Sequence, residues 1–253
     1  MARRSSLTRP RFRRYGDQSS HLSHCFSVRR LRRPETLLKQ LTHTSLKKAA
    51  KVLASEHSEL AFVYEKYGPP PLWDRPTGFA TLLHIILEQQ VSLASAKACF
   101  DKLTVHIGEV TPDKLLTIND IDLKTIGFSR QKTAYARHLA EAIIEKHIDL
   151  DHLHTLPDAD AKATLIRLKG IGEWTSDVYL LMAMLRPDVM PRGDIALHAA
   201  YQKLTNAEKR PSSDEFIAIA EKWRPFRSVA ARLLWHFYLS ERGRRATGEN
   251  VER

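Results

Sequence analysis

The chain has 253 residues, 43% of them hydrophobic and 27% charged, which is ordinary for a globular protein large enough to bury a core. No stretch approaches the roughly 18 unbroken apolar residues of a membrane span, so we expect no membrane partner. The formal net charge of +11 favours a polyanionic partner, and two cysteines, Cys25 and Cys99, are too few for a disulfide framework, a four-cysteine zinc site or a four-cysteine iron–sulfur cluster.

The basic excess is concentrated at the start of the chain. Residues 1–34 hold ten arginines, no lysine and one acid, Asp17, and carry a net charge of +9, whereas the remaining residues carry only +2. We expect this segment to be a disordered tail outside the folded part. Three interpretations stay open: an arm that binds phosphate backbones, an organelle transit peptide, or a start codon assigned too far upstream.

From residue 35 onward the sequence predicts one helix after another. Gly68-Pro-Pro-Pro71 marks the first linker, and the polar stretch 241–253 is expected to fray. Alternating β-branched runs are almost absent, so we predict an all-α protein of roughly ten helices. The helical periodicity covers residues 37–53, 79–90, 93–106, a helix opened by Thr111-Pro112, and residues 129–147, 158–168, 172–185, 195–204, 213–223 and 227–239.

The most informative segment is Leu168-Lys-Gly-Ile-Gly-Glu-Trp-Thr-Ser176, where two helical patterns meet at a turn. Gly170 and Gly172 allow a tight turn and a close approach of another molecule, and Ile171 between them is expected to be buried. The amide groups that open the second helix would then face outward, which suits a phosphate.

A second motif lies 22 residues after Gly172, at Pro191-Arg-Gly-Asp194. With this motif the chain resembles the helix-hairpin-helix DNA glycosylases of the HhH-GPD superfamily, and most of all their 3-methyladenine DNA glycosylase II (AlkA-type) branch. The resemblance covers roughly residues 60–240. Three further segments contribute to it: Ile86-Leu-Glu-Gln-Gln-Val-Ser92, Ile126-Gly-Phe-Ser-Arg-Gln-Lys132, and Trp223-Arg-Pro-Phe-Arg-Ser228 followed by Trp235.

The resemblance implies a two-lobed helical fold with the active site in the cleft between the lobes. Residues 78–190 would form a helical barrel that ends in the hairpin at 168–176. Residues 35–77 and 191–253 would fold together as the other lobe.

The resemblance implies that Asp194 is the catalytic carboxylate. Cleavage of an N-glycosidic bond builds positive charge on the deoxyribose, which a fixed carboxylate stabilises, and the same group can orient or deprotonate the attacking water. Independently of any family, Asp194 is well placed to cap a helix that begins at Ile195. Both roles can hold at once.

Trp174 and Trp235 match aromatic positions of the base pocket, where an indole face attracts a cationic alkylated purine. A core role for Trp235 stays open. Relatives that also cut the strand carry a lysine at the position of Trp174, and an indole cannot serve as an amine nucleophile. The resemblance therefore implies a monofunctional enzyme. Val178 stands where the family has another aromatic residue, which leaves the lesion range open.

DNA contacts are expected at three places. The first is the hairpin, with Gly170, Ile171, Gly172 and Thr175. The second is the helix junction of Gln89 and Gln90, where Gln90 aligns with the side chain that fills the gap of a flipped nucleotide, although the AlkA-type enzyme has an apolar residue there. A buried glutamine at a helix end is the alternative. The third is the helix start with Ser129, Arg130 and Lys132, for which a solvated charged face is the alternative.

The resemblance implies a base-excision-repair glycosylase that removes 3-methyladenine and 7-methylguanine from double-stranded DNA and leaves an abasic site. We expect a monomer without cofactor or catalytic metal, since neither His152 with His154 nor His21 with His24 and Cys25 has zinc-site partners. A monovalent cation on hairpin carbonyls is a further expectation. The expected location is the cytoplasm of a bacterium, at the nucleoid, or a nucleus or organelle if the tail is a targeting segment.

Two other functions stay open on the sequence. One is a glycosylase for oxidised or mismatched bases, and the other is a non-catalytic helix-hairpin-helix protein that binds DNA. Asp194 separates the last from the enzymes, because a pure binding module has no use for a carboxylate in a phosphate-binding cleft.

Overall fold

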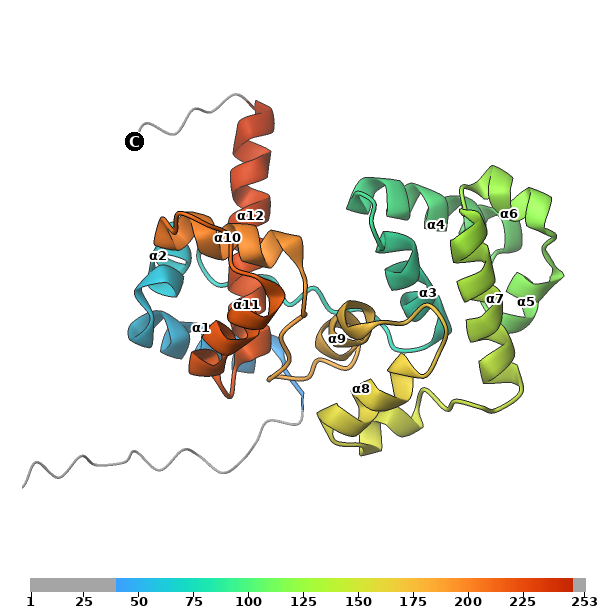
Figure 1. Cartoon of the computed structure of the whole chain (residues 1–253), viewed down its shortest axis with the longest axis horizontal. Helices are drawn as coiled ribbons and strands as arrows, with labels where there is room; N and C mark the ends of the chain where they lie inside the picture. Colours follow the sequence, from blue (N-terminus) through green and yellow to red (C-terminus); the bar gives the residue numbers. More distant parts are fainter. Residues whose placement is uncertain (1–39, 248–253) are drawn as a thin grey trace, which may run out of the picture. The chain divides into compact units, whose positions relative to one another are not determined.

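The structure is a computed structural model that describes residues 40–247, with side chains to residue 243; the basic tail lies outside this range. All regular secondary structure in the described range is helical, as predicted (Figure 1). The elements in chain order are α1 (His43–Glu56), α2 (Ser58–Tyr67), α3 (Phe79–Glu88), α4 (Leu93–Ile107), α5 (Pro112–Thr117), α6 (Asp120–Ile126), α7 (Arg130–Ile144), η1 (His152–Thr155), α8 (Asp158–Ile166), α9 (Glu173–Met182), α10 (Ile195–Thr205), α11 (Ser213–Ala220), η2 (Glu221–Trp223) and α12 (Arg227–Thr247).

The helices contact one another in two sets. In one set, α12 packs against α1, α2 and α10, and α11 leads into α12 through η2. In the other set, α3 packs against α4, α7 and α9, while α5 and α6 contact α7, and α8 contacts α9 (Figure 1). The described residues belong to one compact unit, so the domain boundaries drawn from the sequence stay a prediction.

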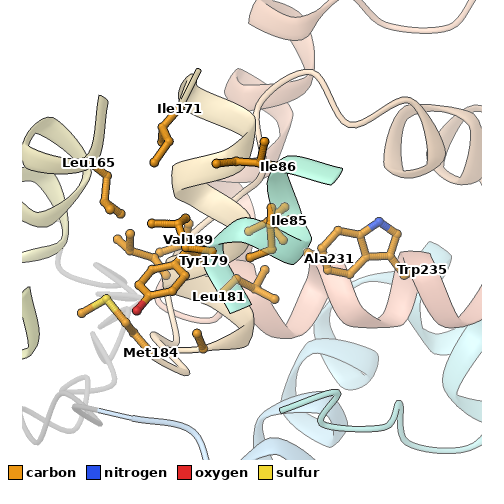
Figure 2. Close-up of a cluster of buried hydrophobic side chains, with 14 of the residues drawn as sticks. Ile85, Ile86, Leu165, Ile171, Tyr179, Leu181, Met184, Val189, Ala231 and Trp235 are labelled. Carbon is orange, nitrogen blue, oxygen red and sulfur yellow. The ribbon is translucent and has the colours of Figure 1, made fainter. Parts of the chain in front are cut away.

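A continuous apolar core joins the two sets. Figure 2 shows part of it, with Ile85 from α3, Leu165 from α8, Tyr179 from α9 and Trp235 from α12 in a single cluster of buried side chains. The helices that carry the two glycosylase-like motifs are therefore fixed to each other by packing.

Arg232 on α12 holds the same region together with polar contacts. Its side chain is fully buried and donates only to backbone carbonyls: Nε to Leu72 at 2.8 Å, one terminal nitrogen to Ser228 at 3.1 Å and the other to Leu181 at 2.8 Å. Burial lowers the pKa of Arg232 to about 9, which still leaves the guanidinium charged at neutral pH. This arginine links the segment before α3, the end of α9 and α12.

Several helix boundaries differ from the sequence prediction, and contacts at the boundary explain two of these differences. Within the described part of the apolar stripe expected over residues 37–53, the helix begins at His43, because Thr42 caps it in a capping box with Ser45. The expectation that residues 241–253 fray is wrong for residues 241–247, since α12 continues to Thr247; residues 248–253 lie outside the described range. Glu241 anchors this extension by accepting hydrogen bonds from Lys66, Tyr67 and Lys203.

Candidate active site

The hairpin is formed by α8, the turn at residues 168–172, and α9. Gly170 has a φ of +92°, and a Cβ added there would lie 2.2 Å from the ring of Tyr135 on α7. A Cβ at Gly172 would meet nothing within 4 Å, and this residue is exposed at the start of α9. Gly170 is thus required by the protein interior, whereas the backbone at Gly172 is open to another molecule.

Two of the predicted hairpin contacts have buried side chains. Ile171 is 3% exposed, and its N–H donates to the Leu168 carbonyl at 3.1 Å, which closes the turn. Thr175 is 2% exposed. In this structure neither side chain can reach DNA, so any contact at these two positions falls to the backbone.

Asp194 follows the turn Pro191-Arg192-Gly193, in which Gly193 has a φ of +77°. Its carboxylate is 8% exposed and accepts three hydrogen bonds. Oδ1 accepts from the backbone N–H of Leu197 at 3.0 Å, which makes Asp194 the N-cap of α10 as the sequence indicated. The other two donors are the indole N–H groups of Trp174, at 2.9 Å from Oδ2, and Trp235, at 3.2 Å from Oδ1.

The structure therefore brings together the three residues that the sequence assigned to catalysis and the base pocket. They come from α9, the start of α10 and α12, which are fixed to each other by the buried core. Both indoles present their N–H edge to the carboxylate. Three N–H donors aimed at one carboxylate stabilise its negative charge and fix its orientation.

His198 lies one turn after Asp194 on α10. Its ring is 6% exposed and tilted against Phe216, with a distance of 4.5 Å between the ring centroids. Burial lowers the pKa of His198, an effect that the charge of Asp194 opposes. The imidazole is therefore neutral at neutral pH and places no positive charge beside the carboxylate.

The junction between α3 and α4 carries two glutamines with different environments. The Gln89 amide donates to the Gly170 carbonyl at 2.8 Å and to the Thr175 hydroxyl at 2.9 Å, so it ties the junction to the hairpin. Gln90 is exposed and has a φ of +57°, which places it at the tip of a sharp turn. Of the two, only Gln90 is free to enter a duplex.

The polar residues at the start of α7 also differ in whether they face solvent or the protein interior. Ser129 caps the helix by accepting from the Lys132 N–H at 3.2 Å, and Arg130 is exposed. The Lys132 ammonium turns inward and donates to the Leu87 carbonyl at 2.6 Å, and burial lowers its pKa. Arg130 is the residue of this group whose charge faces solvent.

Sequence reasoning missed two buried charged residues next to the site, Arg232 and Asp177. Arg232 interrupts the apolar run Val229-Ala-Ala-Arg-Leu-Leu-Trp235, and a single charge inside a buried helix face is a signal that could have found it. Asp177 follows Trp174 by three residues and so lies on the same face of α9.

Within residues 40–247, no group of three or more histidine, cysteine or acidic side chains could hold a metal ion, and no helix is long and apolar enough to cross a membrane. The histidine and cysteine group at 21–25 lies outside the described residues. The hairpin cation stays a prediction.

The chain is similar to known DNA repair proteins. Residues 83–225 match the family model described as HhH-GPD superfamily base excision DNA repair protein. DNA-3-methyladenine glycosylase 1 of Schizosaccharomyces pombe is 28% identical over 173 residues, which are 67% of this chain and 76% of the relative. The Bacillus subtilis protein YfjP is 26% identical over 186 residues, and the match spans 70% of this chain but only 65% of YfjP.

Among solved structures, the Schizosaccharomyces pombe 3-methyladenine DNA glycosylase in complex with abasic DNA superposes with a TM-score of 0.68. The two proteins are 26% identical, and the match covers 74% of this chain and 95% of that one.

Proposed function

The chain belongs to the HhH-GPD superfamily of base excision DNA repair proteins, and from this premise we propose that it is a monofunctional DNA glycosylase for alkylated purines. It would hydrolyse the N-glycosidic bond of bases such as 3-methyladenine and 7-methylguanine in double-stranded DNA and leave an abasic site. The observation that carries the proposal is the buried Asp194 carboxylate, held by Trp174, Trp235 and the Leu197 N–H.

The substrate class follows from the state of that carboxylate. A carboxylate whose oxygens already accept three hydrogen bonds is held as a well-oriented negative charge. Asp194 is thus better suited to stabilise the cationic sugar of a breaking bond than to force water onto an intact one. Purines alkylated at N3 or N7 carry a positive charge and leave readily, so they need no strong base and no general acid.

The product follows from the residue at the start of α9. A strand-cleaving relative would need an amine beside the reacting sugar carbon, whereas the group beside Asp194 is the indole of Trp174. Lys169 is exposed and precedes both glycines of the turn. Water is therefore the nucleophile, and strand breaks require a later treatment with alkali or heat.

DNA binding would use the open backbone of Gly172, the exposed Gln90 and the exposed Arg130. A base inside a duplex is out of reach of a buried carboxylate, so the nucleotide has to leave the stack. We propose that Gln90 occupies the gap. The protein would act as a monomer, in the cytoplasm of a bacterium or in a compartment to which the tail directs it.

The test is release of free base from duplexes that contain either 3-methyladenine or 8-oxoguanine, measured by chromatography under single-turnover conditions. We expect release of the alkylated base, and sodium borohydride should trap no covalent adduct with the DNA. Preferential release of 8-oxoguanine, or an efficient adduct, would contradict the proposal.

Asp194→Asn should reduce excision by roughly 100-fold or more while binding of abasic DNA persists, because the charge is lost and the shape is kept. Asp160→Asn, at an exposed position of α8, is the matched control and should behave like the unaltered protein. Near-normal excision by Asp194→Asn would show that the carboxylate is only a helix cap.

A further inference from the structure

Asp177 on α9 is a buried carboxylate that the proposed chemistry does not use. It is 3% exposed and lines a cavity together with Lys162, Glu173 and Arg192. Its partners are the Lys162 ammonium of α8, at 2.9 Å from Oδ1 and 3.0 Å from Oδ2, and the backbone N–H of Arg192, at 3.2 Å from Oδ2. A carboxylate this deeply buried is costly unless its neighbours compensate it, so its contacts call for an explanation.

The contact with Arg192 falls in the turn that presents Asp194. The same face of α9 holds this turn at two points: Asp177 binds the Arg192 N–H, and Trp174, one helical turn earlier, binds Oδ2 of Asp194. Downstream, the cap of α10 fixes Oδ1. The Asp194 carboxylate is thus held directly by Trp174 and Leu197, and the backbone two residues before it is held by Asp177.

Lys162 offsets part of the electrostatic cost of burying the Asp177 carboxylate. Burial raises the pKa of Asp177, and the charge and hydrogen bond of Lys162 oppose that rise, as does the Arg192 N–H. Glu173 also faces this cluster, with its Oε1 3.6 Å from the lysine nitrogen and its Oε2 3.0 Å from Nε of Arg192. The same cavity is lined by further charged side chains, namely Asp158, Asp188, Arg224 and Arg227. The pKa of Asp177 stays above its usual value because burial outweighs these contacts, and Lys162 is the group that opposes the rise most strongly.

We propose that Asp177 is a positioning residue: by holding the backbone of Arg192 against α9, it sets the Asp194 carboxylate in register with the Trp174 indole, and Lys162 is its counterion. The proposal rests on the proposed catalytic role of Asp194. Displacement of a reacting group by about 1 Å is enough to lower a rate roughly 100-fold, so a contact that touches no substrate can still govern turnover.

The test compares Asp177→Asn with Asp214→Asn in the full chain. An asparagine offers a single acceptor oxygen for the two donors, and its amide group repels one of them. Asp214 is the matched control because it also contacts Arg192, but through the guanidinium, and its side chain is 82% exposed. The readouts are single-turnover excision, abasic-DNA affinity, thermal unfolding, and the indole ¹H–¹⁵N resonances of the four tryptophans.

For Asp177→Asn we expect excision to fall roughly 10- to 100-fold with abasic-DNA affinity retained. The Trp174 indole resonance should shift, while that of Trp223, which is buried against Tyr201 and Phe216, should not. Asp214→Asn should change none of these. Unchanged excision, or lost excision with an unmoved Trp174 resonance, would overturn the proposal.

If Asp177→Asn does not fold, Lys162→Gln tests the same idea with the carboxylate in place. Without its counterion Asp177 becomes protonated at higher pH, so the acid side of the pH–rate profile should move upward. An unmoved profile would overturn the positioning role. If no base is released by any variant, the proposed function has failed, and the Trp174 resonance still reports whether Asp177 sets the position of Asp194.

Discussion

At Gly170 the chain turns with a φ of +92° directly under the Tyr135 ring, whereas Gly172 has an ordinary extended backbone and empty space in front of it. The two glycines of the hairpin are equivalent in the sequence. The structure shows a different reason for glycine at each position: Gly170 is required for folding, and Gly172 matters only when another molecule approaches.

Substitution by alanine at each position distinguishes the folding role of Gly170 from the binding role of Gly172. Gly170→Ala should lower the free energy of unfolding by about 1–3 kcal/mol, because it combines an unfavourable φ with overlap against an aromatic ring. Gly172→Ala should leave thermal unfolding nearly unchanged and weaken the binding of abasic duplex DNA. Equal effects on stability, or intact DNA binding in Gly172→Ala, would show that the turn does not meet DNA in this way.

The sequence predicted the helix caps of the site but not the orientation of every polar side chain. Asp194 was identified as a helix cap and Ser129 was placed at a helix start because these signals are local, and both residues cap their helices in the structure. The inward orientation of Gln89 and Lys132 was not predictable, because their partners Gly170 and Leu87 are 81 and 45 residues away. Whether such a polar side chain points toward the DNA or into the protein can therefore be decided only when its partner, distant in sequence, is known.

At the scale of the helix, α12 shows why the end of an element can escape prediction. The residues after Leu239 are polar and have no apolar periodicity of their own. The last two turns form because Glu241 binds groups from α2 and α10, and such a cluster leaves no trace in the local sequence.

Glu241→Gln should therefore destabilise the protein and change its pH dependence. Although burial raises the pKa of Glu241, the hydrogen bonds of Lys203 and Tyr67 and the charges of Lys203 and Lys66 hold it at about 2, against 4.5 in a free chain. A depressed pKa gives stability that is fully present above pH 4.5 and lost as the pH falls toward 2. We expect a loss of about 1–2 kcal/mol at neutral pH.

The measurement is denaturant unfolding of both proteins between pH 2 and pH 7. The difference between them should shrink as the pH falls below about 4.5. A constant difference would show that Glu241 contributes through packing rather than charge. Glu145→Gln, at an exposed position just after α7, serves as the control.

For the whole molecule, the tail is the feature that neither the fold nor the family explains. Its net charge of +9 can neutralise several phosphates, and each contributes about 0.9 to the slope of log affinity against log salt on B-DNA. Deletion of residues 1–34 should flatten that slope and leave single-turnover excision at saturating enzyme nearly unchanged. An unchanged slope would assign the tail to targeting or to a misassigned start, and lost excision would mean that it contributes to the fold.

The contacts of Arg232 and α12 also decide when this protein can fold during its own synthesis. Arg232 binds the carbonyl of Leu72, 160 residues earlier, and α12 is a principal packing partner of α1 and α2. At about 5–20 residues per second, a ribosome needs roughly 10–30 s to make that intervening stretch. During this interval the nascent α1 and α2 can pack against each other but lack the cover of α12, while α3 to α9 can already assemble. Among the described helices, α1 and α2 are thus the first to be made and among the last to be fully packed.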